Sequence, residues 1–393
     1  MKNLSRASGA MTLMTLACLC GNPANAGPLY TVTTIDGPNP GLGGELTSIQ
    51  GISDKHILVG FAFPNDPCTY SFLYDGTTFS AIQPPAPFSP ECVRAMGVNN
   101  DGKIVGTYGD AVQGDGFLLH NGVYSNIGAV QLPPWPGPRT LPQGISNSGL
   151  IVGNYIDSIG NHGFVDIGGS FDYFNVPGAQ DTFAQGINDI GEVAGNFVDS
   201  TGTHGYVDFW GLIKRLDFPG AQQTAANGVN DLSTVVGSYT DSSSQQHGFI
   251  YTSAGFTTFD VPGGSDTQLT GINNRGQIVG SYDLHGFRAD PKSLILVTGQ
   301  VRLNKPLIQV TIPSTAQFDA STINTASLTF GHLGTEPSLA ACQVLPGAHG
   351  VACTFSTSAS ALQCGDTQAT LVGQLIDGTP IRGSDVIHIA GCN

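Results

Sequence analysis

The sequence is poor in charged residues and in long apolar runs. Charged side chains make up 11% of its 393 residues, against about 25% in an ordinary globular domain. Only 14 residues are basic and 29 are acidic, which gives a formal net charge of −15. An acidic chain repels nucleic acid and anionic membranes, so we expect neither as a partner. No stretch after the first 26 residues approaches the ~20 apolar residues of a membrane-spanning helix, so no membrane span is expected.

The sequence also lacks the common motifs of catalytic and metal sites. It contains no G-x-S-x-G, H-E-x-x-H, Walker, dinucleotide-binding or calcium-loop pattern. No two cysteines have the C-x-x-C spacing of a zinc site. We therefore expect no metal and no cofactor, and assign no catalytic residue. Helical periodicity is absent as well, and the 54 glycines are typical of a turn-rich all-β protein.

The first 26 residues have the pattern of an export signal. Lys2 and Arg6 precede an apolar stretch over residues 10–19, and residues 24–26 (ANA) fit a cleavage site. Loss of the two basic residues would change the net charge from −15 to −17. Lipid attachment at Cys18 is an alternative, disfavoured by the Thr three residues earlier. We expect a soluble, monomeric mature protein that is secreted or periplasmic.

Six cysteines follow the leader, and an even number in an oxidising compartment predicts disulfides. Cys342 and Cys353 flank a turn at Pro346 and are the first expected pair. The remaining cysteines predict two further pairs, Cys364 with Cys392 and Cys68 with Cys92.

A repeat of 42 to 47 residues fills residues 27–290. Each copy reads as four short strands: one ending in G-[IV]-[NS], one containing [IV]-[VA]-G, one containing H-G-[FY], and one of the F-x-x-F-D type. This length is typical of a propeller blade. The G-[IV]-[NS] motif begins at Gly51, Gly97, Gly144, Gly186, Gly228 and Gly271.

The sixth copy lacks the fourth strand, and a matching segment occurs at residues 29–38. Pairing of this segment with the sixth copy would leave no open sheet edge between the first and last repeats. We therefore predict a six-bladed β-propeller over residues 27–290 that is closed by its N-terminal strand.

An Asp and a His recur in the second turn and third strand of the copies. Equivalent residues of different blades would lie ~10 Å or more apart, whereas zinc needs ligands at ~2 Å. We therefore interpret them as structural, the Asp as a turn acceptor. The histidines are His162, His204, His247 and His285.

The copies resemble the HAF-type extracellular repeats of secreted bacterial proteins, because their H-G-F and H-G-Y tripeptides match the H-[AG]-F core of that family. The first two copies depart from it, with Tyr70-Ser71-Phe72 and Asp115-Gly116-Phe117. The resemblance implies an exported propeller-like array. It implies no activity, and so it supplies no catalytic residues.

Residues 291–393 lack the repeat and form a second predicted domain. Segments such as residues 308–312 and 327–330 read as strands between Gly, Pro, Asn and Asp. Residues 308–331 and 378–387 resemble a small β-sandwich module found at the end of exported bacterial proteins. We expect a β-sandwich stabilised by two disulfides.

The second turns and the connections between blades share one face of the predicted propeller, and two of these connections are long and Pro-rich. Trp135 lies in one of them and could stack on a ligand or pack on its own domain. A ring of residues precedes the repeat glycines and could line the central channel or bond neighbouring backbone. These residues are Gln50, Met96, Gln143, Gln185, Asn227 and Thr270.

The leading functional hypothesis is an exported binding or scaffolding module for a glycan or a protein. The alternative is a polysaccharide- or ester-cleaving hydrolase or lyase that uses acidic loop residues such as Asp66, Glu91 and Asp181. A purely structural surface protein is a third possibility.

Overall fold

The computed structural model describes residues 30–37, 46–62, 70–83, 92–109, 115–128, 139–252, 255–291, 296–297, 301–314, 320–345, 350–376 and 380–390. Within these ranges the chain forms strands and a single 3-10 turn at Ala320–Thr322, without any α-helix. The all-β prediction is therefore confirmed. In the same ranges, no helix has the length and apolar character needed to cross a membrane.

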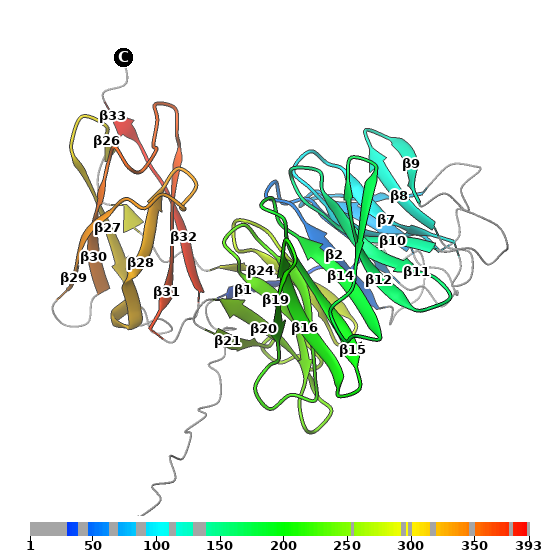
Figure 1. The fold of residues 1–393 in the computed structure, drawn as a ribbon. Coiled ribbons are helices and arrows are strands. Elements are labelled where there is room, and N and C mark those ends of the chain that lie inside the picture. The colour runs from blue at the N-terminus through cyan, green and yellow to red at the C-terminus, as the bar shows by residue number, and fades with distance from the viewer. Residues whose placement is uncertain are drawn as a thin grey trace, which may run out of the picture.

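The repeats fold into four-stranded antiparallel sheets, which we number 1 to 6 in chain order (Figure 1). Sheet 1 is β2 (Thr47–Ile52), β3 (Leu58–Ala62), β4 (Tyr70–Tyr74) and β5 (Phe79–Ala81). Sheet 2 is β6 (Arg94–Val98), β7 (Ile104–Tyr108), β8 (Asp115–His120) and β9 (Val123–Ile127), and sheet 3 is β10 (Arg139–Ile145), β11 (Ile151–Ile156), β12 (Asn161–Ile167) and β13 (Ser170–Phe174).

The next two sheets have the same order. Sheet 4 is β14 (Asp181–Ile187), β15 (Glu192–Asp199), β16 (Gly202–Phe209) and β17 (Leu212–Leu216), and sheet 5 is β18 (Gln223–Val229), β19 (Val235–Thr240), β20 (Gln246–Thr252) and β21 (Gly255–Phe259). Sheet 6 is β22 (Gln268–Ile272), β23 (Ile278–Tyr282), β24 (His285–Pro291) and, outermost, β1 (Tyr30–Thr34). Side-by-side packing of such sheets around a shared centre makes this part of the chain a β-propeller.

A buried aromatic ring from each third strand fills the space between neighbouring sheets. Phe249 of sheet 5, for example, packs in one cluster with Ala194 and Leu216 of sheet 4. Burial of such a ring contributes about 1.5–3 kcal/mol. The equivalent rings, all 0% exposed, are Phe72, Phe117, Phe164, Tyr206, Phe249 and Phe287.

The first strands of neighbouring sheets approach each other at their repeat glycines. A Cβ atom on Gly186 would lie 2.9 Å from both the Asn227 carbonyl oxygen and the Gly228 Cα. A Cβ on Gly97 would lie 3.1 Å from the Gln143 carbonyl oxygen. These are backbone atoms that cannot rotate away, so any side chain here would push two sheets apart.

A β-bulge precedes each of these glycines. In sheet 4 the pairing of β14 with β15 skips from Ala184 to Gly186, and in sheet 5 the pairing of β18 with β19 skips from Ala226 to Gly228. The skipped residues are Gln185 and Asn227, members of the ring expected from the sequence to line the channel. A bulge re-aims the side chain of the extra residue, and here it points to the centre of the propeller.

The C-terminal part contains two facing sheets. One is β25 (Leu296–Val297), β27 (Leu307–Pro313), β30 (Gly350–Ser356) and β29 (Leu339–Val344); the other is β28 (Ile323–Gly331), β31 (Gln368–Leu375) and β32 (Pro380–Val386). A short parallel pair joins β26 (Val301–Arg302) to β33 (Ile389–Ala390). The facing sheets share one core, in which the Phe330 and Phe355 rings lie 4.9 Å apart. We call this part the C-terminal lobe.

The glycine contacts at the centre lead to a stability prediction. Replacing Gly186 with Ala should lower the free energy of unfolding by about 2–3 kcal/mol, because the added methyl group meets backbone of sheet 5. Urea unfolding would measure the loss. Gly128→Ala is the matched control, since a Cβ there meets no atom within 4 Å. Equal stability of the two variants would contradict the proposal that the contact between the first strands has no room for a side chain at Gly186.

Candidate functional site

Several residues singled out in the sequence lie outside the described ranges. They are Trp135, Asp66, Glu91, Cys68 and Cys392. Asp181, the remaining acidic candidate, accepts hydrogen bonds from both the backbone N–H and the side-chain amide of Asn161, at 2.9 and 2.7 Å. Its carboxylate therefore holds a turn in place and is not a free acid in a cleft.

The described part of the chain contains the expected bridge between Cys342 and Cys353. It joins neighbouring positions of β29 and β30 within one sheet of the C-terminal lobe. Cys92 and Cys364 are also disulfide-bonded. The partners expected for them, Cys68 and Cys392, lie outside the described residues.

The recurring histidines each link two segments of their own sheet. His204 on β16 contacts Asp199, the last residue of β15, at 3.3 Å, and its Nδ1 lies 2.8 Å from the Asp217 carboxylate that follows β17. His247 has the same relation to Asp241 and Asp260, at 3.6 and 3.1 Å. These contacts tie the outer two strands to the turn before them.

His162 and His285 differ from this pattern in their partners: His162 has an Asn in place of the second Asp, and the Asp beside His285 comes from the N-terminal segment. The His162 ring lies 3.3 Å from Asp157 and 2.8 Å from the Asn175 side chain. The His285 ring lies 3.1 Å from Asp36, which belongs to the N-terminal segment. Across the described residues, no group of three or more His, Cys, Asp or Glu side chains is placed to hold a metal ion.

The turn aspartates are stabilised in their charged form. The Thr201 hydroxyl and backbone N–H donate to Asp199 and lower the pKa of its carboxyl from 3.8 to about 2. The Ile159 N–H lowers the pKa of Asp157 in the same way, and the Gln245 N–H lowers that of Asp241. These aspartates are turn acceptors, as the sequence predicts.

A polar cavity opens at the centre of the propeller on the face of the second turns. Its volume is about 550 Å³, within the range of small-ligand sites. Amide, hydroxyl and carboxylate side chains dominate its wall, and Phe61 and Met96 add apolar surface. Its described polar side chains are Ser48, Gln50, Gln143, Gln185, Asn196, Asn227, Gln246, Asp266, Gln268, Thr270, Ser281 and Asp283.

The residues before the repeat glycines are expected either to line the central channel or to bond neighbouring backbone, and the structure shows both roles. All six line the cavity, and some also bond protein groups. The Asn227 amide donates to the Leu269 carbonyl at 2.7 Å, and the Thr270 hydroxyl donates to the Ile49 carbonyl at 2.5 Å. Gln185 makes no such bond within the described residues, so its amide can meet a ligand.

The two carboxylates of the cavity are already engaged. Asp283 accepts hydrogen bonds from the backbone N–H and hydroxyl of Ser265, and Asp266 accepts one from the Gln245 amide at 2.8 Å. No lysine, arginine or histidine is among the described residues of the cavity wall. The wall is therefore a hydrogen-bonding surface of neutral to negative charge.

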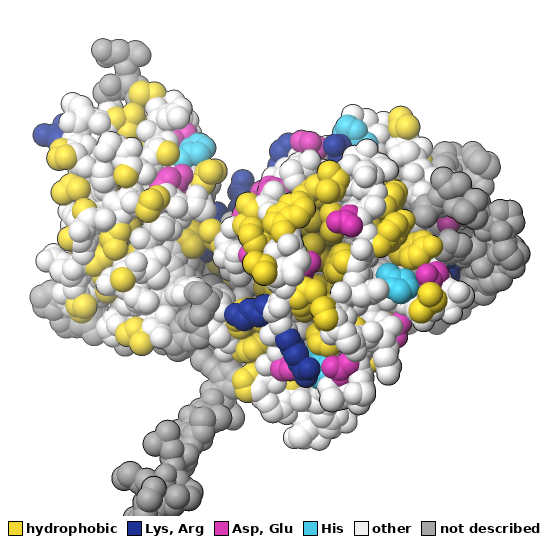
Figure 2. Space-filling model, viewed as in Figure 1, with side chains coloured by type: hydrophobic (Ala, Val, Ile, Leu, Met, Phe, Trp, Pro, Cys, Tyr) yellow, Lys and Arg dark blue, Asp and Glu magenta, His cyan; other side chains and the backbone are white. Residues whose placement is uncertain are grey.

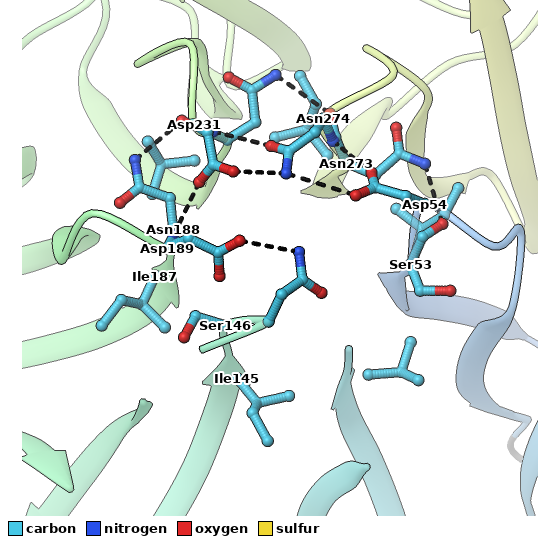
Figure 3. Close-up of a pocket in the computed structure, with 16 residues that line it drawn as sticks. Ser53, Asp54, Ile145, Ser146, Ile187, Asn188, Asp189, Asp231, Asn273 and Asn274 are labelled. Carbon is cyan, nitrogen blue, oxygen red and sulfur yellow. Dashed lines mark hydrogen bonds between the residues drawn. The ribbon is translucent and has the colours of Figure 1, made fainter. Parts of the chain in front are cut away.

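A different ring closes the opposite end of the central axis (Figure 3). The turn after each first strand presents an Asp or Asn whose side-chain oxygen accepts a backbone N–H of the neighbouring sheet, at 2.7 to 2.9 Å. The acceptors are Asn100, Asn147, Asp189, Asp231, Asn274 and Asp54, the last receiving its bond from Asn274. The space between them has a volume of about 60 Å³, well below the range of sites for small organic ligands.

Sequence reasoning missed this ring, although its signal is present. The residue after G-[IV]-[NS] is Asp or Asn in every copy. Burial raises the pKa of Asp231, and the nearby charges of Asp189 and Asp54 raise it further. The ring joins neighbouring sheets through these hydrogen bonds.

Trp210 also has a structural environment. Its indole N–H donates to the Ile190 carbonyl at 3.2 Å, and the ring lies over Gly191, where a Cβ would be 2.6 Å from it. The side chain is nonetheless 63% exposed.

Neither a protein-family model nor a curated protein sequence matches the chain. Among solved structures, a catalytically inactive virginiamycin B lyase from Staphylococcus aureus with quinupristin is 11% identical, over 66% of this chain and 99% of that one, with a TM-score of 0.41. A variant of AofleA from Arthrobotrys oligospora is 12% identical, over 68% of this chain and 89% of that one, with a TM-score of 0.41. Aleuria aurantia lectin with Fucalpha1-6GlcNAc is 8% identical, over 70% of this chain and 93% of that one, also with a TM-score of 0.41. Similarities this weak assign no ligand to the chain.

The lowered pKa of Asp199 predicts a response to acid. Its folded-state pKa lies below the unfolded value, so its contribution to stability is present above about pH 4 and lost as the pH falls toward 2. An Asp199→Asn variant should therefore lose less stability between pH 4.5 and pH 2.5 than the natural chain. Urea midpoints at the two pH values would measure this. Asp172→Asn, at an exposed site on β13, is the control and should behave like the natural chain.

Proposed function

We propose that the chain is an exported binding module, built from a closed six-bladed β-propeller over residues 27–290 and a β-sandwich domain over residues 291–393. The repeats are of the HAF type, with the third-strand His and aromatic residue as their structural core. The leader pattern of residues 1–26 and the bonded cysteines support export.

Two sets of contacts support closure of the propeller. β1 pairs with β24 over five residues from Tyr30 opposite Pro291, and the Tyr30 ring stacks edge-on against Phe259 at 5.3 Å. Sheet 6 also bonds to sheet 1 at the axis, where the Asn273 side chain donates to the Ser53 carbonyl at 3.0 Å. The first and last repeats are then neighbours like any other two.

Closure predicts that the N-terminal segment contributes to stability. Ile35 is 6% exposed and packs with the core of sheet 1. Replacing Ile35 with Ala should therefore lower the free energy of unfolding by about 2–4 kcal/mol. Thr31→Ala, at an exposed position of β1, should change it little. If both variants unfold like the natural chain in urea, the segment is not docked and the propeller is open.

The ligand that fits the central cavity best is a neutral, polyhydroxylated molecule such as a glycan. The observation that carries this proposal is the wall of amides and hydroxyls, which can donate and accept hydrogen bonds at several points. The absence of basic side chains from its described residues disfavours phosphate or carboxylate ligands. Phe61 and Met96 supply apolar surface for the faces of sugar rings. Binding is favoured over cleavage because Asp266 and Asp283 are held in hydrogen bonds.

A glycan panel tests this proposal. The protein should bind neutral oligosaccharides and discriminate against those rich in uronic or sialic acid. A Gln143→Ala/Gln185→Ala variant should lose about 10- to 30-fold in affinity, since a hydrogen bond contributes about 1 kcal/mol. Gln223→Ala, at an exposed position of β18 outside the cavity, is the control. Preference for acidic glycans, or full binding by the double variant, would refute this ligand class.

A further inference from the structure

A second cavity lies between the propeller and the C-terminal lobe. Its volume is about 320 Å³, and both parts contribute aliphatic side chains to it, among them Leu232, Ile272, Val372 and Ile381. Figure 2 shows a notch between the two parts, with basic side chains along its edge. A larger cavity of about 720 Å³ adjoins it and shares Leu232, Pro291 and Arg382 with it.

Arg382 is the one charged side chain among the described residues of the smaller cavity. It projects from β32 over the 273–276 turn of sheet 6, and its guanidinium donates to the Asn274 carbonyl at 2.5 Å. This is its single hydrogen bond to the described residues, although a guanidinium carries five N–H donors. Burial lowers the pKa of Arg382 to about 10, so it remains charged at neutral pH.

Tyr30 supplies a second unused polar group on the wall of the same cavity. The residue is only 7% exposed, yet its hydroxyl makes no hydrogen bond to any residue that the structure describes. By contrast, the hydroxyl of the fully buried Tyr206 donates to the Phe183 carbonyl at 3.1 Å. The Tyr30 hydroxyl is not among the buried side-chain atoms that lack a partner in the described residues, so it is open to the cavity and can donate a hydrogen bond to a ligand there.

We propose that this cavity binds a small carboxylate with an apolar body. The carboxylate would accept hydrogen bonds from the free guanidinium donors of Arg382, whose planar group matches a carboxylate, and from the Tyr30 hydroxyl. The apolar body would lie against Leu232, Ile272, Val372 and Ile381. Asp54, Asp231 and Asp290 line the larger cavity and not the smaller one, so the carboxylate avoids direct contact with them.

Bound carboxylate would also bridge the two parts of the molecule, because Tyr30 belongs to sheet 6 and Arg382 to the C-terminal lobe. This site is independent of the central cavity, with which it shares no described residue. Failure of one proposal therefore leaves the other intact.

The test is calorimetric titration of the full mature chain with octanoate and with octanamide, which matches octanoate in shape and lacks its charge. Octanoate should bind at least about 10-fold more tightly, because one hydrogen bond between charged groups contributes about that factor in affinity. Arg382→Gln should abolish the difference. Tyr30→Phe should weaken octanoate about 3- to 10-fold and leave the preference in place. Arg302→Gln, at an exposed position of β26, is the matched control and should bind as the natural chain does.

Three outcomes would overturn the proposal: no binding of octanoate, equal binding of octanoate and octanamide, or an unchanged preference in Arg382→Gln. Loss of Arg382 could also separate the two parts, which small-angle scattering would reveal as a larger radius of gyration. In that case Tyr30→Phe decides, because it keeps the contact between Arg382 and Asn274. Octanoate affinity equal to that of the natural chain in this variant would make Arg382 an interface residue alone.

Discussion

The propeller depends on the close approach of six first strands at one axis. They can come this near because the residue at each contact is a glycine, so the backbone of one sheet lies directly on that of the next. A ring of larger residues would need a wider centre, and the aromatic rings of the third strands would no longer fill the space between sheets. The glycine spacing and the aromatic packing therefore have to agree, which explains why both recur in every copy.

The contacts at the axis divide the molecule into two different ends. On one side, Asp and Asn side chains of the first turns bond the neighbouring sheet and leave a space of only about 60 Å³. On the other, the bulges direct amide side chains inward around an open cavity. The first end thus holds the sheets together, and the second has an open cavity with room for a ligand. The C-terminal lobe lies at the closed end, where Arg382 meets Asn274, and leaves the cavity uncovered.

Much of the fold could be predicted from the sequence, because its determinants are local and repeated. The H-G-F tripeptides predict the third strands, and the turn acceptors such as Asp157 follow from their spacing. The Cys342–Cys353 bridge follows from a hairpin between them. The central cavity was harder to predict, since it depends on a bulge that shifts Gln185 by one position in the pairing register. The site between propeller and lobe was not predictable at all: Tyr30 and Arg382 are distant in sequence, and only tertiary packing brings them together.

The pairing of β1 with β24 has a consequence for the order of events during synthesis and export. β1, which is synthesised before the other described strands, has its partner about as far along the chain as the propeller extends, from Tyr30 to Pro291. Five sheets can form from consecutive residues as they emerge, but the sixth must wait for the first segment to return. Long-range pairing of this kind is slow to find. During that interval the edge of β24 has unpaired backbone N–H and C=O groups, which can pair with other chains. Pairing with the N-terminal strand satisfies these groups and removes the exposed edge.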